Sequence, residues 1–75
     1  METNNTLAQL HPGQSARVRK VGGERPIRRR LMDMGITTGV EITVVKVSPF
    51  GDPVEYRLRG YNLSLRKSEA QLIEV

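Results

Sequence analysis

The sequence contains no cysteine and no tryptophan among its 75 residues, and it contains only one histidine. Without cysteine, the chain can form no disulfide and offers no thiolate to a metal ion. A facial triad for ferrous iron needs two histidines and a carboxylate, so one chain cannot supply that site. We therefore expect no strong metal site and no cofactor, and we interpret His11 as a structural or exposed residue.

Long apolar runs are also absent, since no stretch approaches the ~18 residues that a membrane span needs. The N-terminal residues Met1–Thr6 lack the basic and apolar regions of a signal peptide. We expect a cytoplasmic chain that does not insert into a membrane, with residues 1–6 as a flexible tail and residues 7–75 as a single domain.

The sequence offers no recognisable catalytic constellation. No nucleophile has a paired base, the carboxylates are scattered, and there is no glycine-rich phosphate loop of the known patterns. Gly22 and Gly23 precede a helical pattern, and helix punctuation explains them better than an anion site does. We predict that the chain is not an enzyme.

One convincing helix is predicted over about residues 24–34. Ile27, Leu31 and Met34 recur at helical spacing. Pro26 suits a first turn, and Gly35 suits the position just past a helix C-terminus.

The other segments alternate at the spacing of β-strands. Residues 40–47 change phase in mid-strand, which predicts a bulge or sharp bend. A short helical turn is expected at residues 68–70. The sequence thus predicts a mainly β, small barrel of about five strands with one inserted helix. The predicted strands cover residues 14–21, 40–47, 54–59, 61–65 and 72–75.

Positive charge is concentrated around the helix, in a chain of net charge +4. Arg28, Arg29 and Arg30 are consecutive, and Asp33 follows at a spacing that allows an ion pair with Arg29 or Arg30. One interpretation is a solvated face partly neutralised by Asp33. The other is a docking surface for an acidic partner, because arginine pairs well with carboxylates and phosphates.

Exposure on this helix and on one loop selects the candidate partner-binding residues. Met32 lies off the apolar stripe, and Phe50 lies in a loop over residues 48–53 that is rich in turn formers. The candidate residues are Arg28, Arg29, Met32 and Asp33 on the helix, with Phe50 as a separate loop contact.

Nucleic-acid binding is an alternative, since small barrels bind RNA through basic grooves and exposed aromatic side chains. Tyr56 and Tyr61 alternate with outward residues and are expected in the core, which leaves Phe50 as the one exposed aromatic. Such a surface would bind nucleic acid weakly and without specificity.

Four segments in order resemble the FeoA family and cover nearly the whole chain from residue 7 to residue 75. They are an opening with two leucines and a Pro-Gly turn, a helix that ends in a Leu-x-x-Met-Gly-Ile pattern before a second glycine, a central loop, and a closing pattern. These segments are Leu7–Gln14, Arg30–Gly39, Pro49–Val54, and Leu63–Arg66 followed by Glu69, Ala70 and Ile73–Val75. One departure is Thr38, where the family often has proline.

The resemblance implies an SH3-like barrel and a non-enzymatic role beside FeoB, a membrane ferrous-iron transporter with a cytosolic G-protein domain. The chain would then be cytoplasmic, or peripheral at the inner membrane through the transporter. The resemblance also implies transition-metal binding, which here would be weak or would need two subunits. The same fold occurs in the C-terminal domain of repressors of the diphtheria-toxin-repressor type, so metal sensing stays open as another alternative.

Overall fold

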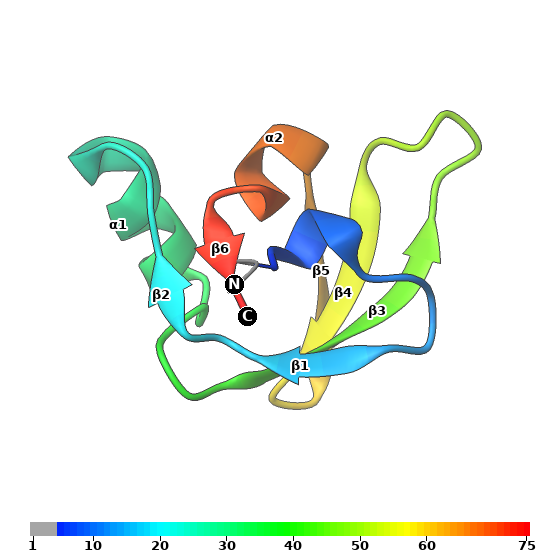
Figure 1. Cartoon of the computed structure of the whole chain (residues 1–75), viewed down its shortest axis with the longest axis horizontal. Helices are drawn as coiled ribbons and strands as arrows, with labels where there is room; N and C mark the ends of the chain where they lie inside the picture. The colour runs from blue at the N-terminus through cyan, green and yellow to red at the C-terminus, as the bar shows by residue number, and fades with distance from the viewer. Residues whose placement is uncertain (1–4) are drawn as a thin grey trace, which may run out of the picture.

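The computed structural model describes residues 5–75 and confirms a mainly β fold with helical additions (Figure 1). This part of the chain holds six strands and two α-helices, and the second helix, of four residues, is the helical turn expected at residues 68–70. In order, the elements are a 3-10 turn Leu7–Gln9, β1 Ser15–Arg17, β2 Lys20–Val21, α1 Arg25–Asp33, β3 Glu41–Val47, β4 Val54–Leu58, β5 Tyr61–Leu65, α2 Lys67–Ala70 and β6 Ile73–Glu74. No helix within residues 5–75 is long and apolar enough to cross a membrane.

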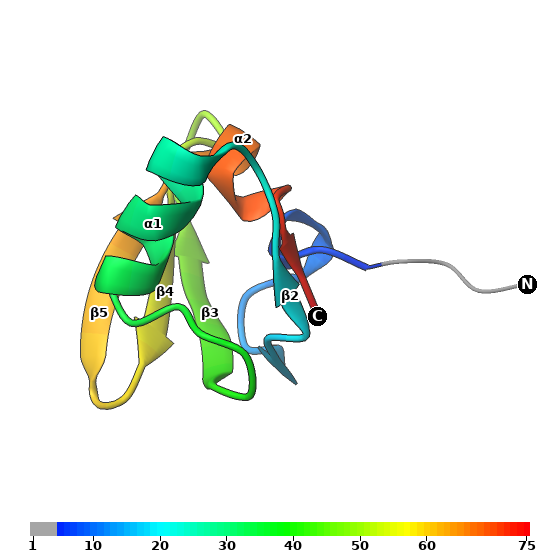
Figure 2. The same ribbon diagram turned by 90° about the vertical axis from the view of Figure 1, so that its left-hand side faces the viewer.

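The strands form two antiparallel sheets. One sheet has the order β1-β3-β4-β5 and the other pairs β2 with β6. Figure 2 shows β3, β4 and β5 on one side of the molecule and β2 with the C-terminus on the other. The apolar faces of both sheets meet in between, so the two sheets share one core.

The single strand predicted over residues 14–21 is wrong, because the chain changes sheets within it. Ser15–Arg17 pairs with β3, while Lys20–Val21 pairs with β6. At the corner, the Val18 N–H donates to Val40 and the Arg19 N–H donates to Glu74. Val18 and Val21 are both buried although strict alternation would place them on opposite faces, and this odd spacing marks the corner.

The predicted irregularity in residues 40–47 is confirmed. The pairing of β3 with β4 shifts register between Val44 and Lys46, so Val45 is the extra residue of a bulge. Val44 is buried, whereas Val45 and Val47 are 38% and 40% exposed. The bulge therefore bends the sheet and brings two valines to the surface.

The hairpin β4–β5 closes through Arg59 and Gly60, whose φ angles are 51° and 84°. Positive φ at both central residues is the signature of a type I′ turn, which matches the twist of the two strands. The predicted inward side chains of β4, Val54, Tyr56 and Leu58, are all buried.

Tyr61 corrects the sequence analysis, which placed this side chain in the core. It lies at the first position of the edge strand β5 and is 43% exposed. Its hydroxyl donates a hydrogen bond to the carbonyl of Met34 at the end of α1. Tyr61 therefore joins the hairpin to the helix from the surface.

Helix α1 begins after Glu24 and ends in a Schellman motif. The Gly35 N–H donates to Met32 at 3.0 Å, and the Ile36 N–H donates to Leu31 at 3.1 Å. Gly35 has a φ of 100°, a conformation that favours glycine. Leu31 and Ile36 are fully buried. The helix predicted over residues 24–34 is confirmed within one residue at each end.

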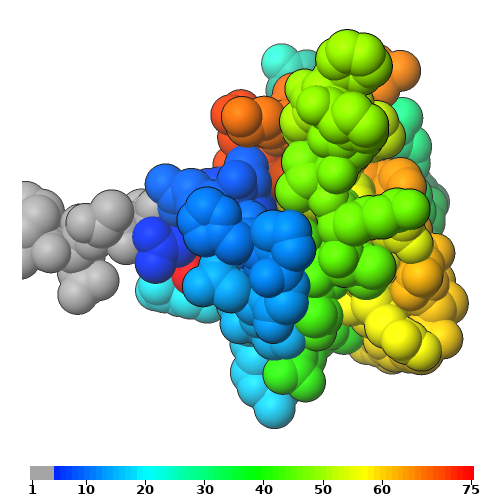
Figure 3. Space-filling model, turned by 90° about the vertical axis from the view of Figure 1, so that its right-hand side faces the viewer, coloured from blue at the N-terminus to red at the C-terminus, as the bar shows by residue number. Residues whose placement is uncertain are grey.

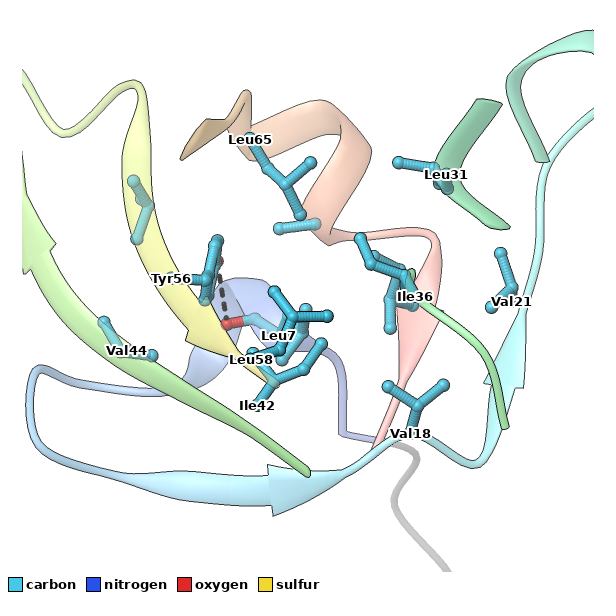
Figure 4. Close-up of a cluster of buried hydrophobic side chains, with 13 residues drawn as sticks. Leu7, Val18, Val21, Leu31, Ile36, Ile42, Val44, Tyr56, Leu58 and Leu65 are labelled. Carbon is cyan, nitrogen blue, oxygen red and sulfur yellow. Dashed lines mark hydrogen bonds between the residues drawn. The ribbon is translucent and has the colours of Figure 1, made fainter. Parts of the chain in front are cut away.

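The core joins every layer of the molecule (Figure 4). In the view, Leu31 and Ile36 lie near Val21, where α1 meets β2. Tyr56 is buried at the centre, and its hydroxyl donates a long hydrogen bond of 3.4 Å to the carbonyl of Leu7. The 3-10 turn of Leu7 therefore closes over the sheet.

The described N-terminus pairs with the C-terminal strand. Thr6 forms an isolated antiparallel bridge with Glu74, and the carbonyl of Asn5 accepts a hydrogen bond of 2.9 Å from Val75. Asn5 and Thr6, which we assigned to the tail, thus lie against the fold. The remaining residues of the expected tail, 1–4, lie outside the described residues.

Candidate functional site

The exposed face of α1 carries four of the five predicted site residues. The helix buries Leu31 and leaves Arg28, Arg29, Met32 and Asp33 exposed. Successive helical residues are about 100° apart, so Arg28 and Met32 share one side and Arg29 and Asp33 share the next. The sequence-based expectation that Met32 is exposed is confirmed at 46%.

A hollow of about 280 Å³ opens between α1 and β2. We call it the basic groove. Its lining includes Arg28 and Met32 from the helix, but Arg29 and Asp33 do not line it. The complete lining is Arg19, Lys20, Val21, Arg28, Met32 and Thr38.

Sequence reasoning missed two cations of the basic groove. Arg19 and Lys20 are eight or more residues from Arg28, and they reach it because β2 packs against α1. The corner that splits the first predicted strand moves Lys20 out of the four-stranded sheet and into the pair of β2 with β6. The odd spacing of Val18 and Val21 is the one signal in the sequence that could have shown the corner.

Charge pairing leaves the basic groove positive. The predicted ion pair of Asp33 with Arg29 or Arg30 does not occur, and Arg30 instead pairs with Glu69 of α2. This is the one ion pair that residues 5–75 form. Arg19, Lys20 and Arg28 therefore have no carboxylate within ion-pair distance in the described part of the chain.

Glu69 holds α1 and α2 together from below this surface. Its side chain is only 11% exposed, and it accepts hydrogen bonds from the Arg30 guanidinium and, at 2.9 Å, from the backbone N–H of Arg66. The second bond caps the first turn of α2. Arg30 thus serves packing between elements, which separates it from its exposed neighbours Arg28 and Arg29.

Phe50 lies apart from the basic groove, as expected. Its side chain is 94% exposed at the tip of the loop between β3 and β4. Figure 1 shows this loop at the opposite side of the molecule from α1, and Figure 3 shows the same segment projecting from the surface. The loop is anchored by a bond of 2.9 Å from the Lys67 N–H to the Asp52 carboxylate. Phe50 is therefore a separate candidate contact.

The exposed aromatics do not form a joint platform. Phe50 precedes β4, and Tyr61 follows the turn at the other end of that strand. A five-residue strand separates its ends by roughly 15 Å. Stacking of successive bases needs neighbouring aromatic rings, so the two residues do not offer the surface that single-stranded nucleic acid prefers.

The residues present in one chain do not fit a transition-metal site. His11 is exposed, and no group of three or more histidine, aspartate or glutamate side chains gathers within residues 5–75. A tetrahedral zinc site requires three or four such ligands.

A second hollow of about 420 Å³ lies at the other end of α1. Its lining is largely apolar, and Gly23, Ile27 and Leu72 form part of it. A Cβ atom on Gly23 would lie 2.9 Å from the Leu72 side chain and 3.0 Å from Ile27. Gly23 also has a φ of 94°, which favours glycine just before the helix and agrees with its interpretation as helix punctuation.

Comparison with known proteins identifies the family. The family model described as FeoA domain matches residues 5–75. A fusion protein of Porphyromonas gingivalis, described as Fe(2+) transport protein A joined to Fe(2+) transporter FeoB, is 45% identical over 69 residues. That match covers 92% of this chain and 8% of the fusion protein, so the chain spans less than a tenth of that relative.

Solved structures confirm the SH3-like fold. An FeoA-like protein from Clostridium acetobutylicum is 43% identical, with a TM-score of 0.88 that covers 99% of this chain and 86% of that one. FeoA of Stenotrophomonas maltophilia, solved with zinc and described as a prokaryotic SH3 domain protein, is 32% identical. Its TM-score is 0.81, over 92% of this chain and 86% of that one.

The same fold also occurs in a more distant class of proteins. A manganese-dependent transcriptional repressor superposes with a TM-score of 0.86 at 18% identity, over 100% of this chain and 41% of the repressor. At that identity the likeness shows the fold alone, and it agrees with the expected relation to a repressor domain. On the match over residues 5–75 and on relatives above 30% identity, the chain belongs to the FeoA family.

Proposed function

We propose that this chain is a non-enzymatic accessory protein of ferrous iron uptake that docks on the cytosolic part of a FeoB-type transporter. The fusion protein of Porphyromonas gingivalis carries this proposal, because its FeoA part is 45% identical to the chain and is joined to FeoB. Covalent joining holds two modules at high effective concentration, which favours pairs that work in contact. The chain would act in the cytoplasm, held at the inner membrane through the transporter.

The exposed face of α1 is the docking surface that we propose. Arg28 and Arg29 present guanidinium groups that pair bidentately with carboxylates, and exposed arginines of this kind are enriched at interfaces. Met32 adds a flexible apolar contact, and Asp33 adds one acidic group at the edge that restricts which partner fits.

The loop of Phe50 is the second contact that we propose. A phenyl ring that is 94% exposed gains more apolar burial from a partner than any other side chain of the described surface. Because the loop and α1 lie at opposite sides of the molecule, a partner that touches both must wrap around the barrel or present two separate segments.

A transition metal, if one binds, would bind between two copies of the chain or between the chain and the transporter. One chain lacks the ligands in residues 5–75, whereas two copies would contribute two His11 side chains. The relative from Stenotrophomonas maltophilia was solved with zinc, which motivates this part of the proposal.

Binding of the full chain to the cytosolic G-protein domain of FeoB from the same organism tests the proposal. Isothermal titration should show saturable binding, and comparison with and without a GTP analogue would reveal whether nucleotide controls docking. Absence of binding to this domain and also to the full-length transporter in membranes would rule the proposal out.

A further inference from the structure

We infer that the basic groove binds an acidic, extended segment of a partner protein, which places carboxylates on its rim and one apolar side chain on its floor. The inference rests on the proposed function for the identity of the partner, but it concerns the chemistry that the partner must present. It assigns a site to Arg19, Lys20 and Arg28 together with Val21, Met32 and Thr38.

The rim of the groove carries three cations and no carboxylate. Arg19 and Lys20 come from the β2 side, and Arg28 comes from the α1 side. None of the three forms an ion pair with any of residues 5–75. Positive groups on both sides of a hollow favour a ligand whose negative charges are spread along its length.

Three acidic residues lie near the groove, but none of them neutralises its cations. Glu74 lies opposite Lys20 in the β2–β6 ladder, yet the two side chains form no ion pair. Glu24 precedes α1, and Asp33 lies on the neighbouring side of the helix. None of the three lines the hollow. The rim therefore keeps its positive charge and is available to an acidic partner.

The floor of the groove is apolar and adaptable. Val21 is 8% exposed at the base, and Met32 is 46% exposed on the helix side. A methionine side chain adjusts to different apolar groups because it is unbranched and polarisable. The volume of about 280 Å³ falls just below the usual range for small-molecule sites, so it suits a side chain and its flanking backbone.

These features favour a protein segment over nucleic acid. Phosphates would also be attracted to the three cations, but bases need aromatic platforms, and no aromatic residue lines this hollow. A phosphodiester backbone has no apolar group to bury against the floor of the groove, whereas an acidic protein segment can place a leucine or methionine there. We therefore commit to an acidic protein segment and treat RNA as an outcome of the test.

Amide chemical shifts of the isotope-labelled full chain provide the test. The probe is a heptapeptide of aspartates and glutamates with one central leucine, compared with the same peptide carrying a central serine. We expect the leucine peptide to bind more tightly, with the largest shifts at Val21, Met32 and Thr38. Its dissociation constant should rise with salt, since exposed charge pairs are screened.

Substitutions then test the individual cations. Lys20→Ala and Arg28→Ala should each weaken peptide binding by about two- to fivefold, the range of an exposed ion pair. Arg57→Ala is the matched control, because Arg57 is exposed on the outward face of β4, between the buried residues Tyr56 and Leu58. This control should bind like the wild type, and the spectra of all variants report whether the fold is intact.

Several results would overturn the inference. One is a lysine-rich peptide that binds as tightly as the acidic peptide. Another is a set of amide shifts centred on the Phe50 loop. The third is mixed-sequence RNA that shifts the same amides at lower concentration than the acidic peptide does.

Two outcomes distinguish a failure of the inference from a failure of the proposed function. A FeoB cytosolic domain that binds but moves only amides outside the groove contradicts the inference and leaves the proposed function intact. A groove that binds the acidic peptide, in a chain that neither the FeoB cytosolic domain nor the full-length transporter recognises, supports the inference and contradicts the proposed function.

Discussion

At the scale of single residues, Gly35 and Tyr61 form the contact that fixes the end of α1. Gly35 adopts a φ of 100°, and a Cβ atom there would collide with the Tyr61 hydroxyl. That hydroxyl donates to the carbonyl of Met34. The positive φ of Gly35 ends the helix, and the absence of a Cβ atom there lets the phenol of the hairpin approach the helix end.

Alanine at Gly35 should destabilise the protein more than alanine at Gly39. Gly39 has a φ of 94° but open space around it, so both substitutions strain the backbone and only Gly35→Ala adds a collision. We expect the free energy of unfolding of Gly35→Ala to be lower than that of Gly39→Ala by about 1–3 kcal/mol, the usual cost of overpacking. Urea unfolding of both variants measures the difference.

Removal of the Tyr61 hydroxyl provides the control. In a Tyr61→Phe background the collision disappears, so the two alanine variants should differ much less. If the difference between them stays the same in that background, the contact with Tyr61 is not its cause.

Tyr56 should make stability depend on alkaline pH. Burial raises the pKa of its phenol to about 12 from the ordinary value of 10.0. The folded state then holds the proton more tightly than the unfolded state between pH about 10 and about 12, so the free energy of unfolding falls as pH rises through this window. The slope should approach roughly 1.4 kcal/mol per pH unit.

Comparison with Tyr56→Phe isolates this contribution. The variant loses only a hydrogen bond of 3.4 Å, so it should be slightly less stable below the window. Above pH about 10 the wild type should lose its stability advantage over Tyr56→Phe. Only the wild type has the phenol proton whose release favours unfolding. Denaturant unfolding one pH unit below and one above the ordinary pKa measures both effects. Parallel pH dependence of the two proteins would contradict the account.

Periodicity predicted most side-chain positions and failed where the geometry depends on another element. Met32 and Phe50 are exposed and Tyr56 is buried, as expected from a helix stripe, a turn-rich loop and an alternating strand. Tyr61 obeys the same alternation yet lies 43% exposed, because it begins an edge strand and finds its partner on α1. No local pattern contains that contact.

At the scale of elements, Glu69 couples α1 to α2. It caps the backbone of Arg66 and pairs with Arg30, and its side chain is nearly buried whereas that of Arg30 is 60% exposed. The two partners of the ion pair should therefore contribute unequally to stability. Loss of the buried carboxylate leaves two donors without an acceptor, while loss of the exposed guanidinium leaves the cap in place.

We expect Glu69→Ala to lower the free energy of unfolding by about 1–3 kcal/mol. Glu69→Gln should cost less, since its amide oxygen can still cap Arg66. Arg30→Ala should cost less than Glu69→Ala, because the carboxylate keeps its hydrogen bond to Arg66 and no donor is left without an acceptor. Thermal or urea unfolding of the three variants checks this order. Arg29→Ala is the control, because Arg29 is exposed and forms no ion pair within residues 5–75. If Glu69→Ala and Arg29→Ala lower the free energy of unfolding equally, the Glu69 contact does not hold the helices together.

The boundaries of elements were more predictable than their pairing. Start and stop signals placed α1 because Pro26 and Gly35 act locally on the backbone. The split of the first strand was missed because the change of sheet depends on β3 and β6, which lie far along the chain. The exposure of Arg28 and Met32 on α1 could therefore be predicted, whereas the position of Arg19 and Lys20 beside them could not.

At the scale of the whole molecule, metal binding should depend on a partner. Ligand binding to the folded state at one hundred times its dissociation constant adds ~2.7 kcal/mol of stability. We expect excess zinc or manganous ions to leave the melting temperature of the monomeric chain nearly unchanged. Thermal unfolding with sedimentation of the same samples measures this. A marked rise without self-association would contradict our expectation that the site is shared between subunits.

At this scale we propose docking through one side of the molecule, the exposed face of α1. Arg28 of the basic groove has no carboxylate partner within residues 5–75, while Arg30 is neutralised by Glu69. A net charge of +4 would attract acidic partners from any direction, so the net charge alone cannot define an interface. An interface is instead identified when reversal of one charge lowers the affinity and reversal of another charge does not.

The most direct measurement compares Arg28→Glu with Arg57→Glu in binding to the cytosolic G-protein domain of FeoB. Both substitutions change the net charge equally, so any difference reports the position of the charge. We predict that Arg28→Glu weakens binding by about tenfold or more, as expected for like charges at an interface, and that Arg57→Glu binds like the wild type. Equal affinities of the two folded variants would contradict docking through α1.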